Sequence, residues 1–126
     1  MRAIDTNVLV RLVARDDERQ TAAAEQFVNT GAWVSHVALV EAVWVLESVY
    51  DLGKEGIVTA LEMLLDHTDL TIQDADAIGA ALARFRRRGA PDFSDCAMLE
   101  IARKAGHLPL GTFDRALARI DGAESL

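Results

Sequence analysis

Short apolar segments that lead to an acidic residue are the feature that most constrains the fold of this 126-residue chain. The four acids are, in chain order, Asp5 after Ala3-Ile4, Glu41 inside VALVEAVWVL, Asp95 in PDFSDCAML and Asp114 after LPLGTF. Apolar runs that end in a carboxylate are typical of the carboxyl ends of buried parallel strands, where open α/β sheets bind their ligands. The sequence therefore predicts an α/β fold in which acids from distant parts of the chain converge.

Length and composition predict one globular domain over residues 1–126, because 51% of the residues are hydrophobic and can bury a substantial core. The chain has no run of eighteen apolar residues and no basic segment followed by an apolar one at its start, so we expect a cytoplasmic protein. The single cysteine and three scattered histidines argue against a disulfide framework and a zinc site. A net charge of −7 argues against nucleic-acid binding through a broad basic surface, although divalent cations would offset much of this charge.

Short strands alternate with helices along the chain. Strands are predicted at 2–5, 32–34, 70–72 and 107–111, and helices at 6–13, 16–29, 37–50, 57–65, 74–89 and 91–104, with a last helix after Asp114. Thr6-Asn7 is the predicted N-cap of the first helix, and Ser35 that of the third. Residues 121–126 fit either a frayed tail or an edge strand. The alternation implies right-handed crossovers and a small parallel sheet that is covered on both faces.

Four acidic residues, Asp5, Asp92, Asp95 and Asp114, also have ordinary structural explanations. Asp92 can cap the helix that follows it, with Asp95 in a capping-box-like role, and helix-start statistics favour that explanation for this pair. For Asp5, as a turn residue, and Asp114, as a first-turn acid, the structural and functional explanations are evenly balanced.

Glu41 is the acid that local structure explains least well. Its helical neighbours at three and four residues are all apolar, so its face is predicted to point inward. An unpaired buried carboxylate costs several kcal/mol and must be protonated, pair with a distant arginine or bind a cation. We therefore favour a functional role for Glu41.

Convergence of the acids would require a positive counter-charge. Two carboxylates about 5 Å apart repel each other by about 3 kcal/mol at an effective dielectric constant near 20. A donor set made only of oxygen atoms suits Mg²⁺ or Mn²⁺ better than zinc, and such ions commonly act on phosphate groups. The pattern therefore predicts metal-assisted phosphate chemistry.

Four parts of the chain together resemble a PIN domain and, more narrowly, a VapC-type toxin. They are AIDTNVLVRL, Glu41 in a helix after the second strand, DFSDCAMLEIARKAG and LGTFDRAL. The resemblance covers nearly the whole chain and implies a three-layer α/β/α ribonuclease with a small parallel sheet. It implies Asp5, Glu41 and Asp95 as the principal metal ligands, with Asp114 completing or orienting the cluster. The auxiliary positions that match the family are Asp92, Asn7, Ser94 and Thr112.

The same resemblance implies hydrolysis of an RNA phosphodiester by water, with Mg²⁺ or Mn²⁺ as cofactor. It further implies a homodimer held inactive by a VapB-like antitoxin whose tail fills the acidic cleft and whose DNA-binding part represses their shared operon. An inserted arginine or lysine would suit such a cleft.

Basic and aromatic side chains are weaker candidates for RNA contacts. Arg84, Arg87 and Arg88 fall on one predicted helical face before Asp92, but a solvated helix end is the favoured explanation. Aromatic residues with apolar neighbours are predicted to pack in the core rather than to stack on bases, and these are Trp33, Trp44, Phe27, Phe85 and Phe93.

Three alternatives have less support in the sequence. Phospho-accepting receiver domains resemble one another in having paired acids after the first strand, whereas Asp5 is alone here. They also have a lysine after the fifth strand, and neither Lys54 nor Lys104 is placed there. A haloacid-dehalogenase-like phosphatase would have a second Asp where Asn7 stands. An inactive PIN-like scaffold is also possible, although the presence of all four acids gives no reason to prefer it.

Overall fold

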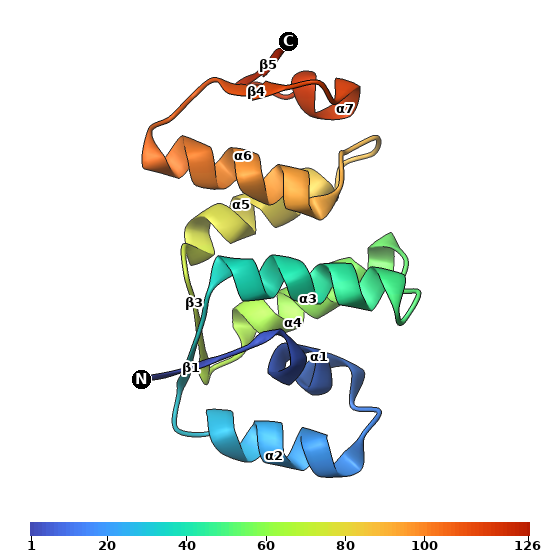
Figure 1. The fold of residues 1–126 in the computed structure, drawn as a ribbon, viewed down its shortest axis with the longest axis vertical. Helices are drawn as coiled ribbons and strands as arrows, with labels where there is room; N and C mark the ends of the chain where they lie inside the picture. Colours follow the sequence, from blue (N-terminus) through green and yellow to red (C-terminus); the bar gives the residue numbers. More distant parts are fainter. The chain divides into compact units, whose positions relative to one another are not determined.

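The computed structural model describes all 126 residues, which form two compact units, Met1–Ala75 and Asp76–Leu126 (Figure 1). The first unit contains, in chain order, β1 (Arg2–Ile4), α1 (Thr6–Ala14), α2 (Glu18–Val28), β2 (Ala32–Val34), α3 (His36–Ser48), α4 (Lys54–Asp66) and β3 (Leu70–Ile72). The second contains α5 (Ala75–Phe85), which begins at the junction, α6 (Phe93–Ala105), β4 (Leu110–Thr112), α7 (Arg115–Ala118) and β5 (Ala123–Ser125).

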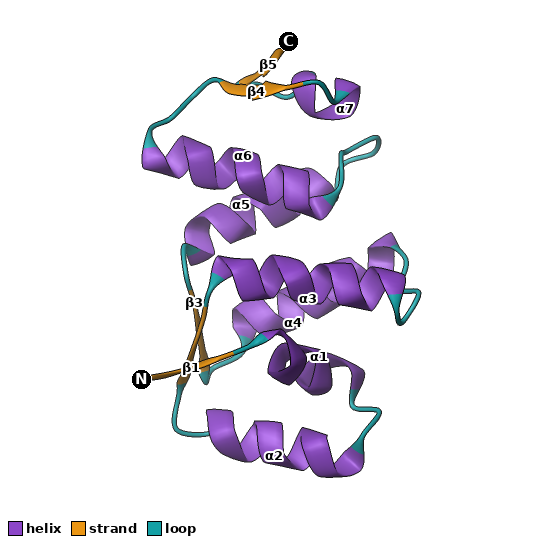
Figure 2. Cartoon of the chain, viewed as in Figure 1, coloured by secondary structure: helices purple, strands orange, loops and turns teal.

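Each unit has its own short parallel sheet among the helices (Figure 2). In the first unit β2 lies between β1 and β3, with Val34 opposite both Ile4 and Ile72. In the second unit β4 pairs with β5, and Leu110 lies opposite Ala123. The predicted α/β class with a small parallel sheet is confirmed, and the C-terminal residues form a strand rather than a frayed tail. The prediction of a single domain stays a prediction.

Several element boundaries differ from the predicted ones, and three of the differences have a clear physical reason. Asp5, not Thr6-Asn7, is the N-cap of α1, whereas Ser35 caps α3 as predicted. α5 ends at Phe85, where its apolar stripe ends, and the following arginines form turns before Gly89. The fourth strand begins only at Leu110, because the proline that precedes it has no N–H to donate to a strand pair.

The core of the first unit is built from one face of each helix. In α3 the buried residues include Leu39, Val43 and Leu46, which recur at helical spacing. The opposite face is open, since Val37 and Trp44 are 64% and 63% exposed. The prediction of a largely buried helix at 37–50 was therefore wrong, because apolar residues all around a helix do not oblige every face to find a partner.

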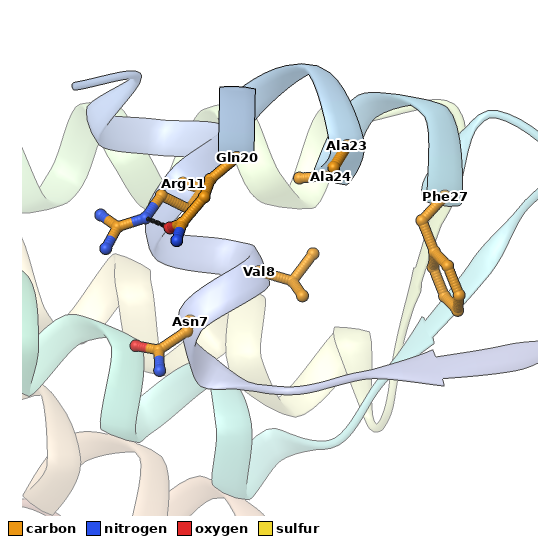
Figure 3. Close-up of a pocket in the computed structure, with 7 residues that line it drawn as sticks. All are labelled: Asn7, Val8, Arg11, Gln20, Ala23, Ala24 and Phe27. Carbon is orange, nitrogen blue, oxygen red and sulfur yellow. Dashed lines mark hydrogen bonds between the residues drawn. The ribbon is translucent and has the colours of Figure 1, made fainter. Parts of the chain in front are cut away.

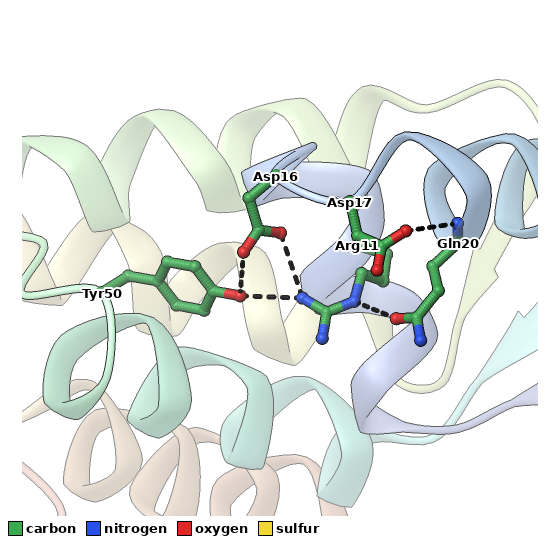
Figure 4. A network of polar contacts seen from close by, with 5 residues as sticks. All are labelled: Arg11, Asp16, Asp17, Gln20 and Tyr50. Carbon is green, nitrogen blue, oxygen red and sulfur yellow. Dashed lines mark hydrogen bonds and ion pairs between the residues drawn. The ribbon is translucent and has the colours of Figure 1, made fainter.

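Polar contacts centred on Arg11 join α1 to the α1–α2 loop and to the end of α3 (Figure 4). Its Nη1 donates to the Tyr50 hydroxyl at 2.8 Å and to Asp16 Oδ1 at 3.1 Å, while its Nε donates to Gln20. The Tyr50 hydroxyl donates to Asp16 Oδ2 at 2.9 Å, and this hydrogen bond holds the pKa of Asp16 below its usual value. Arg11 thus has a structural role.

The second unit has a small core of its own. Leu99, Leu117 and Ile120 are buried together, with Leu110 and Ala123 packed against them. The buried rings of Phe85 and Phe93 also meet edge to face, with centroids 5.9 Å apart, so core packing is confirmed for these two aromatic residues. None of the helices has the length and apolar character needed to cross a bilayer.

Candidate metal centre

Asp5 lies where β1 passes into α1, at the carboxyl edge of the three-stranded sheet. Its Oδ1 accepts a hydrogen bond from the Val8 amide at 3.2 Å, which caps α1. Its Oδ2 has no protein partner, and the residue is exposed. Asp5 therefore has an ordinary structural role at the start of α1, but capping uses only one of its two carboxylate oxygens.

Asp114 repeats this arrangement between β4 and α7. Its Oδ1 accepts from the Leu117 amide at 2.8 Å, and its own amide donates to Thr112 Oγ1 at 2.9 Å. Thr112, an auxiliary position by resemblance, thus fixes the backbone of Asp114. Asp114 is exposed as well, and its Oδ2 is left free to bind a ligand.

Asp92 and Asp95 do not act as the favoured capping explanation predicted. Asp92 occupies the N-cap position of α6, but its side chain makes no cap hydrogen bond. Only its backbone carbonyl accepts, from the amides of Asp95 at 3.0 Å and Cys96 at 3.1 Å. No hydrogen bond returns from the Asp95 side chain to Asp92, so the capping box is absent. Helix capping therefore does not account for either carboxylate.

Asp95 has a shifted acidity. Burial raises the pKa of Asp95, and the negative charges of Asp114 and then Asp92 raise it further. The residue is half-buried in the first turn of α6, whereas Asp92 and Asp114 are exposed. In the second unit, Asp92 and Asp114 thus lie close enough to Asp95 for their negative charges to repel its carboxylate.

Glu41 is exposed, which contradicts the prediction that it points inward. It lies on the open face of α3, with Val37 one turn before it and Trp44 almost one turn after it. The cost of burying a charge therefore gives no argument for Glu41. Its assignment as a metal ligand rests on the family resemblance alone.

Two auxiliary residues have contrasting surroundings. Asn7 is exposed and lines an open groove of about 440 Å³ between α1 and α2 (Figure 3). One end of this groove carries the hydrogen-bonded pair of Arg11 and Gln20, and the other end carries the ring of Phe27. Ser94 is half-buried in the first turn of α6. Neither contacts a carboxylate of its own unit through a hydrogen bond.

The arginines do not form the predicted helical face. Arg84 lies in the last turn of α5, whereas Arg87 and Arg88 lie beyond the helix in the following turns. Arg87 and Arg88 are exposed and Arg84 is half-buried. An RNA contact from these side chains would therefore come from a loop, whose geometry helical spacing does not describe.

The donors suit a hard divalent cation in their chemistry. All the candidate ligands are carboxylates, and a cation would relieve the repulsion that raises the pKa of Asp95. Within each unit, however, no group of three or more acidic, histidine or cysteine side chains is spaced to hold a metal ion. Asp92 and Asp114 are thus close enough to Asp95 to raise its pKa. These three carboxylates do not complete a metal site by themselves.

The aromatic residues differ from the predicted pattern at the surface. Trp44 is 63% exposed, so core packing was wrong for it, and Phe27 is half-buried beside the groove. None of the sequence patterns singled out Phe113, which is 85% exposed and directly precedes Asp114. Its position between a strand and a candidate ligand was the signal available in the sequence.

A family model described as PIN domain matches residues 3–123 of the chain, and the match includes every candidate ligand. No curated protein and no solved structure matches the chain significantly.

Proposed function

The chain belongs to the PIN domain family, whose members are generally nucleases, and from this premise we propose that it is a Mg²⁺- or Mn²⁺-dependent endoribonuclease. The reaction is the hydrolysis of an RNA phosphodiester bond: water adds to phosphorus, the bond to the leaving oxygen breaks, and that oxygen gains a proton. The observation that carries the proposal is the group of Asp92, Asp95 and Asp114, in which burial and then the charges of Asp114 and Asp92 raise the pKa of Asp95.

We assign the metal to Asp5, Glu41, Asp95 and Asp114. A bound divalent ion would polarise the phosphodiester, assist ionisation of the attacking water and stabilise the leaving oxygen. The free Oδ2 atoms of Asp5 and Asp114 support this assignment, because each residue can cap its helix and still bind an ion. Capping also fixes the orientation of both carboxylates before the ligand arrives.

The surrounding residues of the second unit serve the same carboxylates. Thr112 holds the backbone of Asp114 through its hydroxyl, which restricts where that carboxylate can point. Asp92 adds a negative charge near Asp95, which increases the demand for a cation there. We infer supporting roles at the cleft for Asn7 and Ser94 from the resemblance alone.

We further propose that the protein is a VapC-type toxin that acts in the cytoplasm as a homodimer. A VapB-like antitoxin would inhibit it, and the acidic carboxylates would suit an arginine or lysine inserted by that partner. Arg84, Arg87 and Arg88 remain proposed contacts for RNA phosphates. An inactive scaffold is the alternative that an activity test must address, whereas the family match gives no support to a receiver domain.

The test is incubation of the purified, partner-free protein with total cellular RNA in Mg²⁺ or Mn²⁺, followed by sequencing of the new RNA ends. Reactions with EDTA and reactions with the Asp95→Asn variant are the controls. We expect new ends that require both the metal and Asp95. Folded protein that produces none on total RNA or on short single-stranded RNAs would support the scaffold alternative.

A further inference from the structure

Phe113 is the most exposed large hydrophobic side chain in the protein, with 85% of its surface accessible. It lies between Thr112, the last residue of β4, and Asp114, the N-cap of α7. A large aromatic ring left in water at this position contributes almost nothing to the core. A single exposed hydrophobic residue is common on protein surfaces, so what matters here is that Phe113 directly precedes a candidate metal ligand, Asp114.

Hydrogen bonds on both sides hold the backbone around Phe113 in place. The Asp114 amide donates to Thr112 Oγ1 at 2.9 Å, and the Leu126 amide donates to the Thr112 carbonyl at 3.0 Å. The Leu117 amide then donates to Asp114 Oδ1 at 2.8 Å. The ring thus projects from an ordered turn, so little conformational entropy of the backbone would be lost when a ligand contacts it.

Because Phe113 lies beside acidic residues, a contact with RNA that needs no positive charge would be useful there. The protein carries a net charge of −7, and the carboxylates of Asp92, Asp95 and Asp114 repel a phosphate backbone. Two cations of the second unit are already paired, Arg103 with Glu100 and Lys104 with Asp76. Stacking of a base on an aromatic ring supplies affinity that does not depend on cations and tolerates any base.

We propose that Phe113 stacks on an unpaired base of the RNA next to the scissile phosphate. This inference rests on the proposed nuclease function. Paired bases are stacked on one another inside a duplex and cannot cover the ring, so the contact selects loops and unpaired segments. An apolar side chain of a protein partner is the competing occupant, and the experiment below separates the two.

The test compares variants of the full-length chain in the Asp95→Asn background, which prevents cleavage. Binding of a fluorescein-labelled single-stranded 12-nucleotide RNA is followed by anisotropy, alongside the same sequence in a duplex. The variants are Phe113→Ala, Phe113→Leu and Phe113→Trp, with Met98→Ala as the matched control because Met98 is another exposed apolar residue of the same unit, 53% accessible. Thermal unfolding should be unchanged in all of them, since the ring is not packed.

We expect Phe113→Ala to weaken binding of the single-stranded RNA by roughly tenfold, with Phe113→Leu nearly as weak and Phe113→Trp as tight as the parent. The loss should persist at high salt, because stacking releases no counterions. Duplex binding and the Met98→Ala variant should show no such loss. In an otherwise native protein, Phe113→Ala should raise KM while kcat changes little.

Equal single-strand affinity of the Phe113→Ala variant and the parent would overturn the stacking role. Equal losses of single-stranded and duplex binding in Phe113→Ala would also overturn it, because the contact would then need no unpaired base. A Phe113→Leu variant that binds as tightly as the parent would do the same, because the contact would then need no aromatic ring. Loss of binding to a protein partner with unchanged RNA affinity would assign the ring to that partner. A native protein that cleaves RNA while these variants bind normally refutes only this inference. Phe113-dependent binding without any cleavage refutes only the nuclease.

Discussion

The two units present their acids in different ways. In the first unit Asp5 caps α1 and Glu41 lies on the open face of α3, and both residues are exposed. In the second unit the carboxylates of Asp92, Asp95 and Asp114 act on one another, and the pKa of Asp95 rises. Capping does not distinguish the two, because Asp5 and Asp114 both cap helices. Burial of a carboxylate close to other carboxylates does, because Asp95 is half-buried near the negative charges of Asp114 and Asp92, whereas Asp5 and Glu41 are exposed.

The largest expected effect comes from removing the charge at Asp95. Asp95→Asn should lower kcat/KM for RNA cleavage by more than 100-fold, beyond the 10–100-fold typical of residues that only orient metal ligands. The same variant should unfold at a somewhat higher temperature in metal-free buffer at neutral pH, because a repelled, half-buried charge is gone. Cleavage rates and melting curves measure the two effects. Asp66→Asn, an exposed acid on α4, is the control, and near-normal cleavage by Asp95→Asn would exclude Asp95 from the site.

The next effect should come from Glu41, in the other unit. Glu41→Gln should weaken Mg²⁺ binding and cleavage by about 10- to 100-fold. The free energy of unfolding should change by less than about 0.5 kcal/mol, because the side chain is exposed. Calorimetric titration with Mg²⁺ and denaturant unfolding measure these quantities, with Glu55→Gln as the matched control. Unchanged metal affinity would remove Glu41 from the proposed ligands.

Asp5 allows its capping role and its proposed ligand role to be separated. Asn caps helices about as well as Asp, so Asp5→Asn should lower cleavage by about tenfold and leave stability nearly intact. Asp5→Ala should lower cleavage to the same extent and also cost about 1 kcal/mol of unfolding free energy. Asp17→Ala is the matched control, because Asp17 caps α2 through the Gln20 amide and should cost similar stability with normal cleavage. Full activity of Asp5→Asn would mean that Asp5 is only a cap.

The smallest effect should be a shift in pH dependence at Asp92. Because the pKa of Asp95 is raised in the folded protein, its ionisation lowers stability as pH rises from the ordinary value of about 3.8 through the raised one. Asp92→Asn removes one repelling charge and should lower the pKa of Asp95. The acid limb of the kcat/KM profile should then move to lower pH, and neutral-pH stability should rise slightly. An acid limb at the same pH as in the native protein and in Asp66→Asn would contradict this coupling.

Most of the local structure could be predicted from the sequence. The strands at 32–34 and 70–72 and the cap at Ser35 were predicted correctly, because alternation of strands with helices and capping chemistry act over a few residues. The exposure of Glu41 and Trp44 could not be predicted. A helix that is apolar on nearly every side contains no local signal for which face other elements will cover.

For the candidate ligands too, some properties could be predicted from the sequence and others could not. Their identity and order, from Asp5 to Asp114, are properties of the sequence, and all of them lie within the family match over residues 3–123. The missing cap hydrogen bond at Asp92 and the burial of Asp95 appear only in the folded chain. Helix-start statistics favoured capping there because they average over many helices, whereas the rotamer of one side chain depends on its own neighbours.

By itself, the sequence determined the α/β class, the family and the chemical type of the candidate ligands. These depend on residue type and on spacing along the chain. Only the tertiary structure decided which face of α3 is open, which carboxylates share one electrostatic environment and that Phe113 is left in water. Burial and charge repulsion depend on distances in space, and residues as far apart in sequence as Asp95 and Asp114 interact only when the chain has folded.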